Sequence, residues 1–213
     1  MKQKSHILPI IILSQFACTS SWFAGNAILE SLTKKLDFGS EIISYVISSV
    51  QFGFIIGTLL FGILMIADRF SPSKVFMVCA LLAAISNLAL ILPQLTVSSL
   101  LLARFSTGFF LAGIYPVGMK IAADYYEKGL GKALGFLVGA LVLGTAFPFL
   151  IKGTPWVNNP NNVIMLTSII TAIGGVLLFI LVPHGPFRVA SSILKLDAGP
   201  KLFKNYKFRK AAF

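Results

Sequence analysis

One arginine lies inside a long apolar stretch of the sequence, and its side chain has the strongest need for a chemical partner there. Arg104 falls about four residues into the segment 100–123. A guanidinium stays charged in proteins, and its fork of N–H donors matches a carboxylate or another planar anion. No Asp or Glu lies within an apolar stretch to pair with it. Two interpretations follow: the side chain extends to the outer polar interface, or it points into a water-filled cavity and binds an anionic group or a carboxylate from elsewhere.

Other polar residues recur at helical spacing and predict a shared cavity with Arg104. They form one face in the segment 7–29, a weaker stripe in 42–67, and a face in 100–123 that Arg104 shares with Gly108, Leu111 and Tyr115. The predicted cavity residues are Gln15, Thr19, Trp22, Asn26, Gln51, Arg104 and Tyr115. The alternative is that the small polar side chains only hydrogen-bond between helices, at about 0.6 kcal/mol each.

Six apolar stretches carry these residues and fill nearly the whole chain of 213 residues. About 20 residues of helix, rising about 1.5 Å each, cross a hydrocarbon layer of roughly 30 Å. A hydrophobic fraction of 56% with 12% charged residues excludes a soluble domain of this length. We therefore expect an all-α membrane protein, a bundle of six transmembrane helices in residues 1–183. The predicted spans are 7–29, 42–67, 75–93, 100–123, 130–151 and 163–183.

The net charge of +11 is best explained by topology. Lys and Arg concentrate at the amino terminus, in the second and fourth connections and in the tail after Pro183. Cytoplasmic loops are enriched in these residues, so both termini are predicted to be cytoplasmic, and no nucleic-acid partner is expected. The segment 184–213 alternates basic and apolar residues, which predicts a cytoplasmic segment on an anionic leaflet or, alternatively, a solvated linker. Cys18 and Cys79 fall in spans and indicate packing, with no metal site.

Glycines predict where helices approach closely. Gly53 and Gly57 in the second span, and Gly131, Gly135 and Gly139 in the fifth, recur every four residues and would admit another backbone. In the fourth span, Gly113, Pro116 and Gly118 predict a kink, because proline removes a hydrogen bond and clashes with the preceding turn. Gly144 and Pro148 predict a similar weakening in the fifth span.

Two motifs resemble those of the major facilitator superfamily. The stretch Gly62-Ile-Leu-Met-Ile-Ala-Asp68-Arg69-Phe-Ser-Pro-Ser-Lys74 joins the second and third spans, and Arg104-Phe-Ser-Thr-Gly108 lies in the fourth. The resemblance implies a conformational motif made of Asp68, Arg69 and Lys74. The loop departs from the family pattern at Leu64 and Ser71, where glycine is usual. The stretch 113–120 also resembles nitrate/nitrite-type and related anion permeases.

This resemblance implies a fold and a function. The fold would be the amino-terminal half of a twelve-helix carrier, built from two three-helix repeats. The function would be secondary active transport of a small or anionic solute across the cell inner membrane by alternating access. Helices two and five would face the second half, so the partner would be a missing carboxy-terminal half or a second copy. Asp68 would connect the cytoplasmic ends of the two halves.

Two other classes of function compete with transport. The chain could be a non-transporting membrane scaffold or a self-assembling half-transporter. A membrane-embedded enzyme is disfavoured, because His6 and His184 are isolated, and Asp124 and Glu127 have no His nearby for acid-base or metal chemistry. No enzyme activity and no cofactor are therefore expected.

Overall fold

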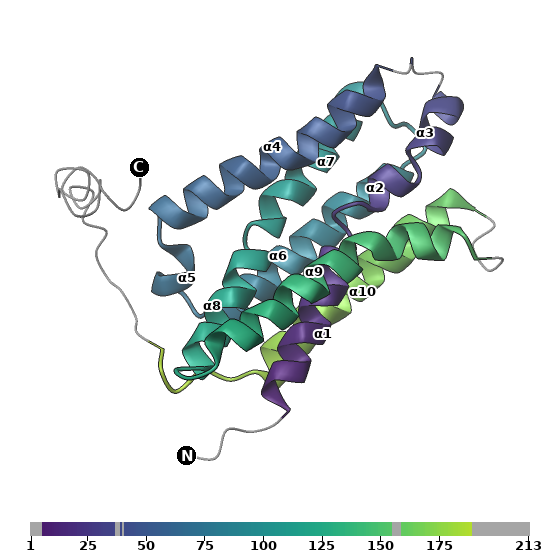
Figure 1. The fold of residues 1–213 in the computed structure, drawn as a ribbon. Coiled ribbons are helices and arrows are strands. Elements are labelled where there is room, and N and C mark those ends of the chain that lie inside the picture. Colours follow the sequence, from purple (N-terminus) through teal and green to yellow (C-terminus); the bar gives the residue numbers. More distant parts are fainter. Residues whose placement is uncertain (1–5, 37–38, 40, 155–158, 189–213) are drawn as a thin grey trace, which may run out of the picture.

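The computed structural model describes residues 6–36, 39, 41–154 and 159–188, and every regular element among them is helical (Figure 1). Of the predicted basic tail, residues 189–213 lie outside the described residues. The elements in order are α1 (Ile7–Thr19), α2 (Ala24–Ala27), α3 (Leu29–Leu36), α4 (Ile42–Ile63), α5 (Ile66–Arg69), α6 (Pro72–Leu88), the 3-10 turn η1 (Ala89–Ile91), α7 (Val97–Leu111), α8 (Tyr115–Tyr125), α9 (Leu130–Lys152) and α10 (Pro160–Leu181).

Five helical stretches in the described part of the chain are long and apolar enough to cross a membrane, and α1 is a shorter apolar helix beside them. This confirms the all-α membrane bundle. The start of α1 and the end of α10 lie at the same end of the bundle (Figure 1). Large apolar side chains remain exposed along the helices, among them Leu150 and Ile180, as expected when lipid replaces water as the surrounding solvent.

The first predicted span, 7–29, is not one continuous helix. Its first helix, α1, ends at Thr19, and α2 begins at Ala24 after a turn. Three consecutive hydroxyl side chains precede or enter this turn: Thr19, Ser20 and Ser21 donate to the carbonyls of Gln15, Ala17 and Cys18, respectively. Such local bonds compete with the helical ladder and favour its end. The prediction of an unbroken first helix was wrong for this reason.

The fourth predicted span is interrupted where the sequence predicted a kink. The helix α7 ends at Leu111 and α8 begins at Tyr115, with Pro116 in the first turn of α8. Proline is favoured there because its missing N–H would have had no helical partner. By contrast, α9 continues to Lys152 with Pro148 inside it. The second span ends early, because Met65 takes a left-handed conformation with φ of 51° after α4.

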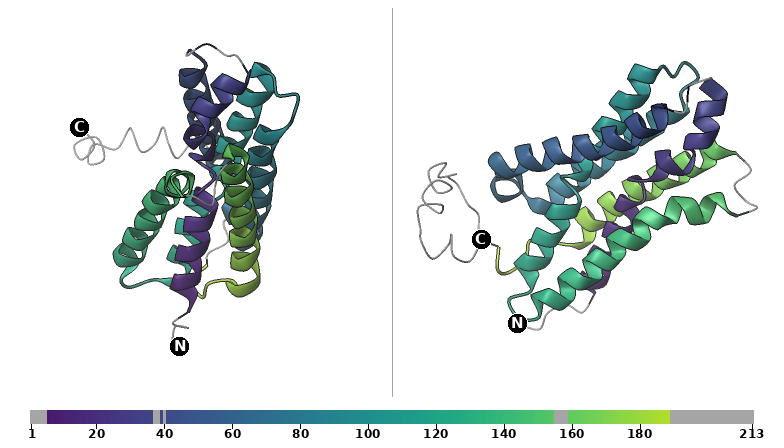
Figure 2. Two further views of the ribbon diagram at one scale, coloured as in Figure 1. Left: turned by 90° about the vertical axis from the view of Figure 1, so that its right-hand side faces the viewer. Right: turned by 45° about the horizontal axis from the view of Figure 1, so that its top comes forward.

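The contacts between helices are the same in the two halves of the bundle, the first three spans and the last three. The helix α4 packs against α7, and α9 packs against α1. In the same way α6 contacts α7, α10 contacts α1, and α6 and α10 contact each other at the centre. Exchanging the first three spans for the last three reproduces this pattern, and the two interrupted spans, first and fourth, also exchange. This is the arrangement expected of two three-helix repeats, and Figure 2 shows α4 and α9 on separate parts of the bundle.

A polar contact joins the two central helices. Asn87 of α6 is fully buried and donates from Nδ2 to Ser168 Oγ at 2.9 Å and to Thr167 Oγ1 at 3.2 Å on α10. Gly175 of α10 lies beside Ala80 of α6 at the same interface. A buried amide bound in this way fixes the register of two otherwise apolar helices.

The two predicted glycine stripes differ in their surroundings. A Cβ on Gly53 or Gly57 would collide with the backbone carbonyls of Phe105 or Phe109 on α7. The glycines of α4 therefore pack against another helix of this chain, and not against a second half. At Gly135 and Gly139 on α9, a Cβ would meet no other residue within 4 Å.

These surroundings predict opposite effects of one substitution. Gly53→Ala should lower the free energy of unfolding by about 1–3 kcal/mol, because the new methyl group forces α4 away from α7. Gly139→Ala should leave it unchanged or slightly higher, since alanine favours helix and the space is open. Unfolding of the purified chain by sodium dodecyl sulfate in mixed micelles, followed by circular dichroism, measures both. Equal effects of the two substitutions would contradict the packing described here.

Candidate functional site

Arg104 is fully buried inside the bundle. Its Nη2 donates to the backbone carbonyl of Trp22 at 2.5 Å and to Asn26 Oδ1 at 3.1 Å. Gly25 lies close to the guanidinium, because a Cβ at this position would come within 2.9 Å of Nε. The interpretation in which Arg104 extends to the outer interface is therefore wrong, because the side chain ends on the first span in the interior.

The break in the first span creates this contact. Trp22 lies in the turn between α1 and α2, so its carbonyl is free to accept a hydrogen bond from outside the helix. The indole ring of Trp22 lies on Phe54 of α4, with ring centres 4.6 Å apart. Trp22 therefore connects three segments: it lies in the α1–α2 turn, its carbonyl binds Arg104 of α7, and its ring contacts Phe54 of α4. They are the three spans on which the sequence predicted polar faces.

Several donors at this meeting point have no acceptor. Nε and Nη1 of Arg104 and Nε1 of Trp22 are buried without a hydrogen-bond partner. Among the described residues, no carboxylate forms an ion pair with Arg104. A buried charge without a counter-charge is costly, and intramembrane ionisable groups that persist mark binding sites or ion pathways. The arrangement therefore presents three buried donor atoms and one positive charge that lack a partner among the described residues.

The other predicted cavity residues are placed differently. Gln15 is fully buried with both amide atoms unpartnered, and it lies against Gly118 of α8. Thr19 donates to the carbonyl of Gln15 at 2.8 Å and lies beside Gly144 of α9. Gln51 and Tyr115 are partly exposed. The structure brings together Trp22, Asn26 and Arg104 by direct contact. It does not join the remaining four to them by a hydrogen bond.

A second cluster of charges lies at the end of the bundle where α5 and α8 meet. Asp68 Oδ1 is 2.8 Å from Nζ of Lys120, and Lys120 is also 3.9 Å from Asp124. Asp68 is thus paired within this bundle. Arg69 and Lys74, its neighbours in the predicted motif, are exposed. Sequence reasoning missed Lys120 as the partner, although the residue stands one turn before Asp124 in α8.

The chain after α10 returns to the same cluster. Phe187 donates its backbone N–H to the carbonyl of Asp124 at 3.0 Å, and Arg188 donates to the carbonyl of Phe70 at 3.0 Å. Ser73 of α6 donates to the carbonyl of Val182 at 3.0 Å. The segment 182–188 therefore connects the end of α10 with α6, α8 and the residue that follows α5.

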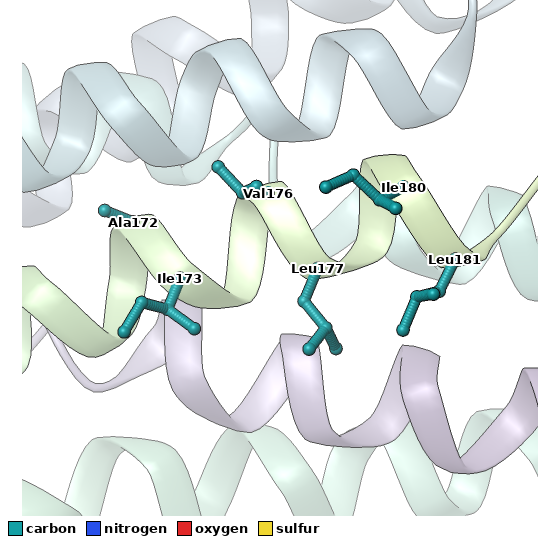
Figure 3. A pocket seen from close by; sticks show the side chains of 6 residues that line it. All are labelled: Ala172, Ile173, Val176, Leu177, Ile180 and Leu181. Atoms are coloured by element: carbon teal, nitrogen blue, oxygen red, sulfur yellow. The ribbon is translucent and has the colours of Figure 1, made fainter.

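A separate hollow on α10 has none of this polar character (Figure 3). It measures about 410 Å³ and is lined by side chains of one helix only, all of them apolar: Ala172, Ile173, Val176, Leu177, Ile180 and Leu181. Such a surface suits lipid chains and offers no donor or acceptor for a polar solute.

The sequence was compared with known families and proteins. The sequence profile of the Major Facilitator Superfamily matches residues 11–210, which is most of the chain. The chain belongs to this superfamily. A search of curated proteins found no match.

Membership in the Major Facilitator Superfamily identifies the chain as a multi-pass membrane protein of a transporter family. Members of this superfamily are transporters and not enzymes. Within the described residues, no three His, Cys, Asp or Glu side chains gather in a way that could hold a metal ion. The groups that the site around Arg104 offers are hydrogen-bond donors and one positive charge.

The contact between Asn26 and Arg104 can be tested by removing the amide. Asn26→Ala should lower the free energy of unfolding by about 1.5–3 kcal/mol, because a hydrogen bond to a buried charged group is lost. Gln51→Ala is the matched control, since Gln51 is also an amide on a membrane helix but makes no hydrogen bond in this structure. The same detergent unfolding assay measures both. If Gln51→Ala lowered the free energy of unfolding as much as Asn26→Ala, the contact between Asn26 and Arg104 would not be the cause of the loss.

Proposed function

We propose that this bundle takes part in the transport of a small anionic solute by alternating access, with Arg104 as the residue that binds the anion. The observation that supports this most directly is the buried guanidinium with two nitrogens unpartnered, Nε and Nη1. A transported anion would supply the missing acceptor and the missing charge together. The indole N–H of Trp22 would add a neutral donor beside it.

The position of the two helix breaks supports this role. Transporter sites are commonly formed where membrane helices are discontinuous, because the break frees backbone groups to bind solute or side chains. Here the breaks follow Thr19 and Leu111, and they lie in the span that supplies Trp22 and in the span that carries Arg104. A change in either break would move the guanidinium relative to its partners.

Alternating access needs a second body against which the bundle can move. We infer that it is a carboxy-terminal bundle or a second copy of this chain. The open glycine face of α9 at Gly131, Gly135 and Gly139 offers a surface to which another helix backbone could approach closely. In this proposal both termini are cytoplasmic and the bundle lies in the inner membrane, in line with the distribution of Lys and Arg.

The pair Asp68–Lys120 would act as a conformational latch. It joins α5 to α8 at the end of the bundle, and both side chains are about three-quarters buried, with 28% and 25% exposed. An ion pair that forms in one conformation of the transporter and breaks in the other changes the rate at which the two conformations interconvert. In one of the two states Asp68 would instead contact the second body and connect the cytoplasmic ends.

The role of Arg104 predicts a specific loss on conservative exchange. Arg104→Lys should reduce the transport efficiency kcat/KM by at least about tenfold, because an ammonium cannot present the planar fork of donors. Currents from proteoliposomes on a solid-supported membrane measure this, with nitrate, nitrite, phosphate and small carboxylates as the solutes. Lys132→Arg, an exposed basic residue on α9, is the control and should behave as the wild type.

Two results would count against the proposed substrate class. Transport of an anion that Arg104→Lys leaves unchanged would remove Arg104 from the site. Neutral or cationic solutes moving while every anion fails would overturn the anionic class. If the chain moves no solute either as a dimer or with a supplied second bundle, a non-transporting scaffold is the better account.

The latch predicts an effect on rate more than on affinity. Asp68→Asn should lower turnover roughly fivefold while KM changes little, since the pair couples to a conformational step and not to the solute. Lys120→Gln should do the same, and the double variant should be no worse than either single one. Glu127→Gln removes an exposed acid in the connection between α8 and α9 and serves as the control. Unchanged turnover in Asp68→Asn proteoliposomes would reject the latch.

A further inference from the structure

A groove of about 530 Å³ runs between α4, α5, α6 and α7, away from Arg104. Its composition changes along its length. Arg69 and Lys74 line it at the end of the bundle where α5 and α6 meet. Beyond them its walls are almost wholly apolar, with Phe61 from α4 and Phe110 from α7 facing α6. A ligand that fits both parts must be charged at one end and apolar along the rest.

The charged end of the groove favours an anion. Arg69 and Lys74 are exposed, and neither forms an ion pair with an acid among the described residues. The nearest acid in the sequence, Asp68, is already paired with Lys120 at 2.8 Å. Arg188 adds a third cation close by, since its guanidinium donates to the carbonyl of Phe70. The end of the groove at Arg69 and Lys74 therefore carries uncompensated positive charge.

The apolar part has the length of an acyl-chain segment. Lys74, Val78 and Leu82 are spaced four residues apart and share one face of α6. The eight residue steps from Lys74 to Leu82 extend about 12 Å along the helix. Val75 and Cys79 are buried beside this face, whereas Val78 and Leu82 are exposed. This face of α6 thus begins at the cation Lys74 and continues along the apolar part of the groove, which is open to the outside of the bundle.

We propose that this groove binds one anionic phospholipid from the surrounding bilayer, with its phosphate on Arg69 and Lys74 and an acyl chain along Val78 and Leu82. The charge complementarity selects the headgroup, because basic residues at a membrane surface attract anionic lipids. The apolar walls select an amphiphile over a soluble anion, because a free phosphate would leave them unfilled. The inference does not depend on the transported solute or on Arg104.

The test compares lipids on the purified full-length chain in a nonionic detergent by native mass spectrometry. Dioleoylphosphatidylglycerol should bind at least about tenfold more tightly than dioleoylphosphatidylcholine. The double substitution Arg69→Gln/Lys74→Gln should abolish this preference. The matched control Lys128→Gln/Lys132→Gln removes the same charge from exposed residues around the α8–α9 connection and should retain it. No preference in the wild type, or an equal loss in the control, would overturn the proposal.

A second pair of measurements tests the apolar part and guards against a variant that fails to fold. Val78→Trp fills the groove without changing charge, and it should weaken binding of dioleoylphosphatidylglycerol. Dihexanoylphosphatidylglycerol, which has the same headgroup and short chains, should bind the wild type much more weakly than the dioleoyl lipid. Equal binding of the two lipids, or full displacement by inorganic phosphate at millimolar concentration, would show a simple anion site and contradict a lipid groove.

Discussion

The bond between the Arg104 guanidinium and the Trp22 carbonyl depends on an interrupted helix. A continuous first span would use that carbonyl in its own ladder, whereas α1 ends at Thr19 and leaves it available. The same bond joins the first span to the fourth, and the ring of Trp22 extends the contact to Phe54 on α4. A charged group can remain in the interior because these partners hold one side of it, yet its Nε and Nη1 have no hydrogen-bond partner among the described residues.

The repeat explains why the two interrupted helices lie where they do. The first and fourth spans are equivalent under exchange of the two three-helix units, and each is broken near its middle, after Thr19 and after Leu111. The chemistry of the two breaks differs, because hydroxyl side chains end α1 whereas Gly113 and Pro116 accompany the break before α8. The uninterrupted outer helices α4 and α9 pack along these broken ones, through Gly53 and Gly57 on one side and Gly144 on the other.

Sequence reasoning predicted the helical bundle and the kink near Gly113, because chain length and proline act locally. It also singled out Arg104 as an intramembrane charge, whose role in binding stays a prediction. It did not predict the break after Thr19, since a Ser or Thr hydroxyl can bond within a helix as readily as it ends one. It also treated the glycines of α4 and α9 alike, because identical spacing does not reveal which face meets a neighbour. Lys120 was missed as the partner of Asp68 because the pairing joins residues far apart in the chain.

Our proposal requires that an anionic solute reach the buried, uncompensated charge of Arg104 during the transport cycle, and a reactive thiol beside it measures this directly. Asn26→Cys, in a chain whose Cys18 and Cys79 are replaced by alanine, would be treated with an anionic sulfonatoethyl or a cationic trimethylammonioethyl methanethiosulfonate. The measured quantity is the ratio of the reaction rate of the anionic reagent to that of the cationic reagent. Our account predicts that this ratio is higher at Cys in position 26 than for a free thiol in solution, and that Arg104→Gln lowers it to the free-thiol value. No reaction at position 26, or a rate ratio that Arg104→Gln leaves unchanged, would contradict it.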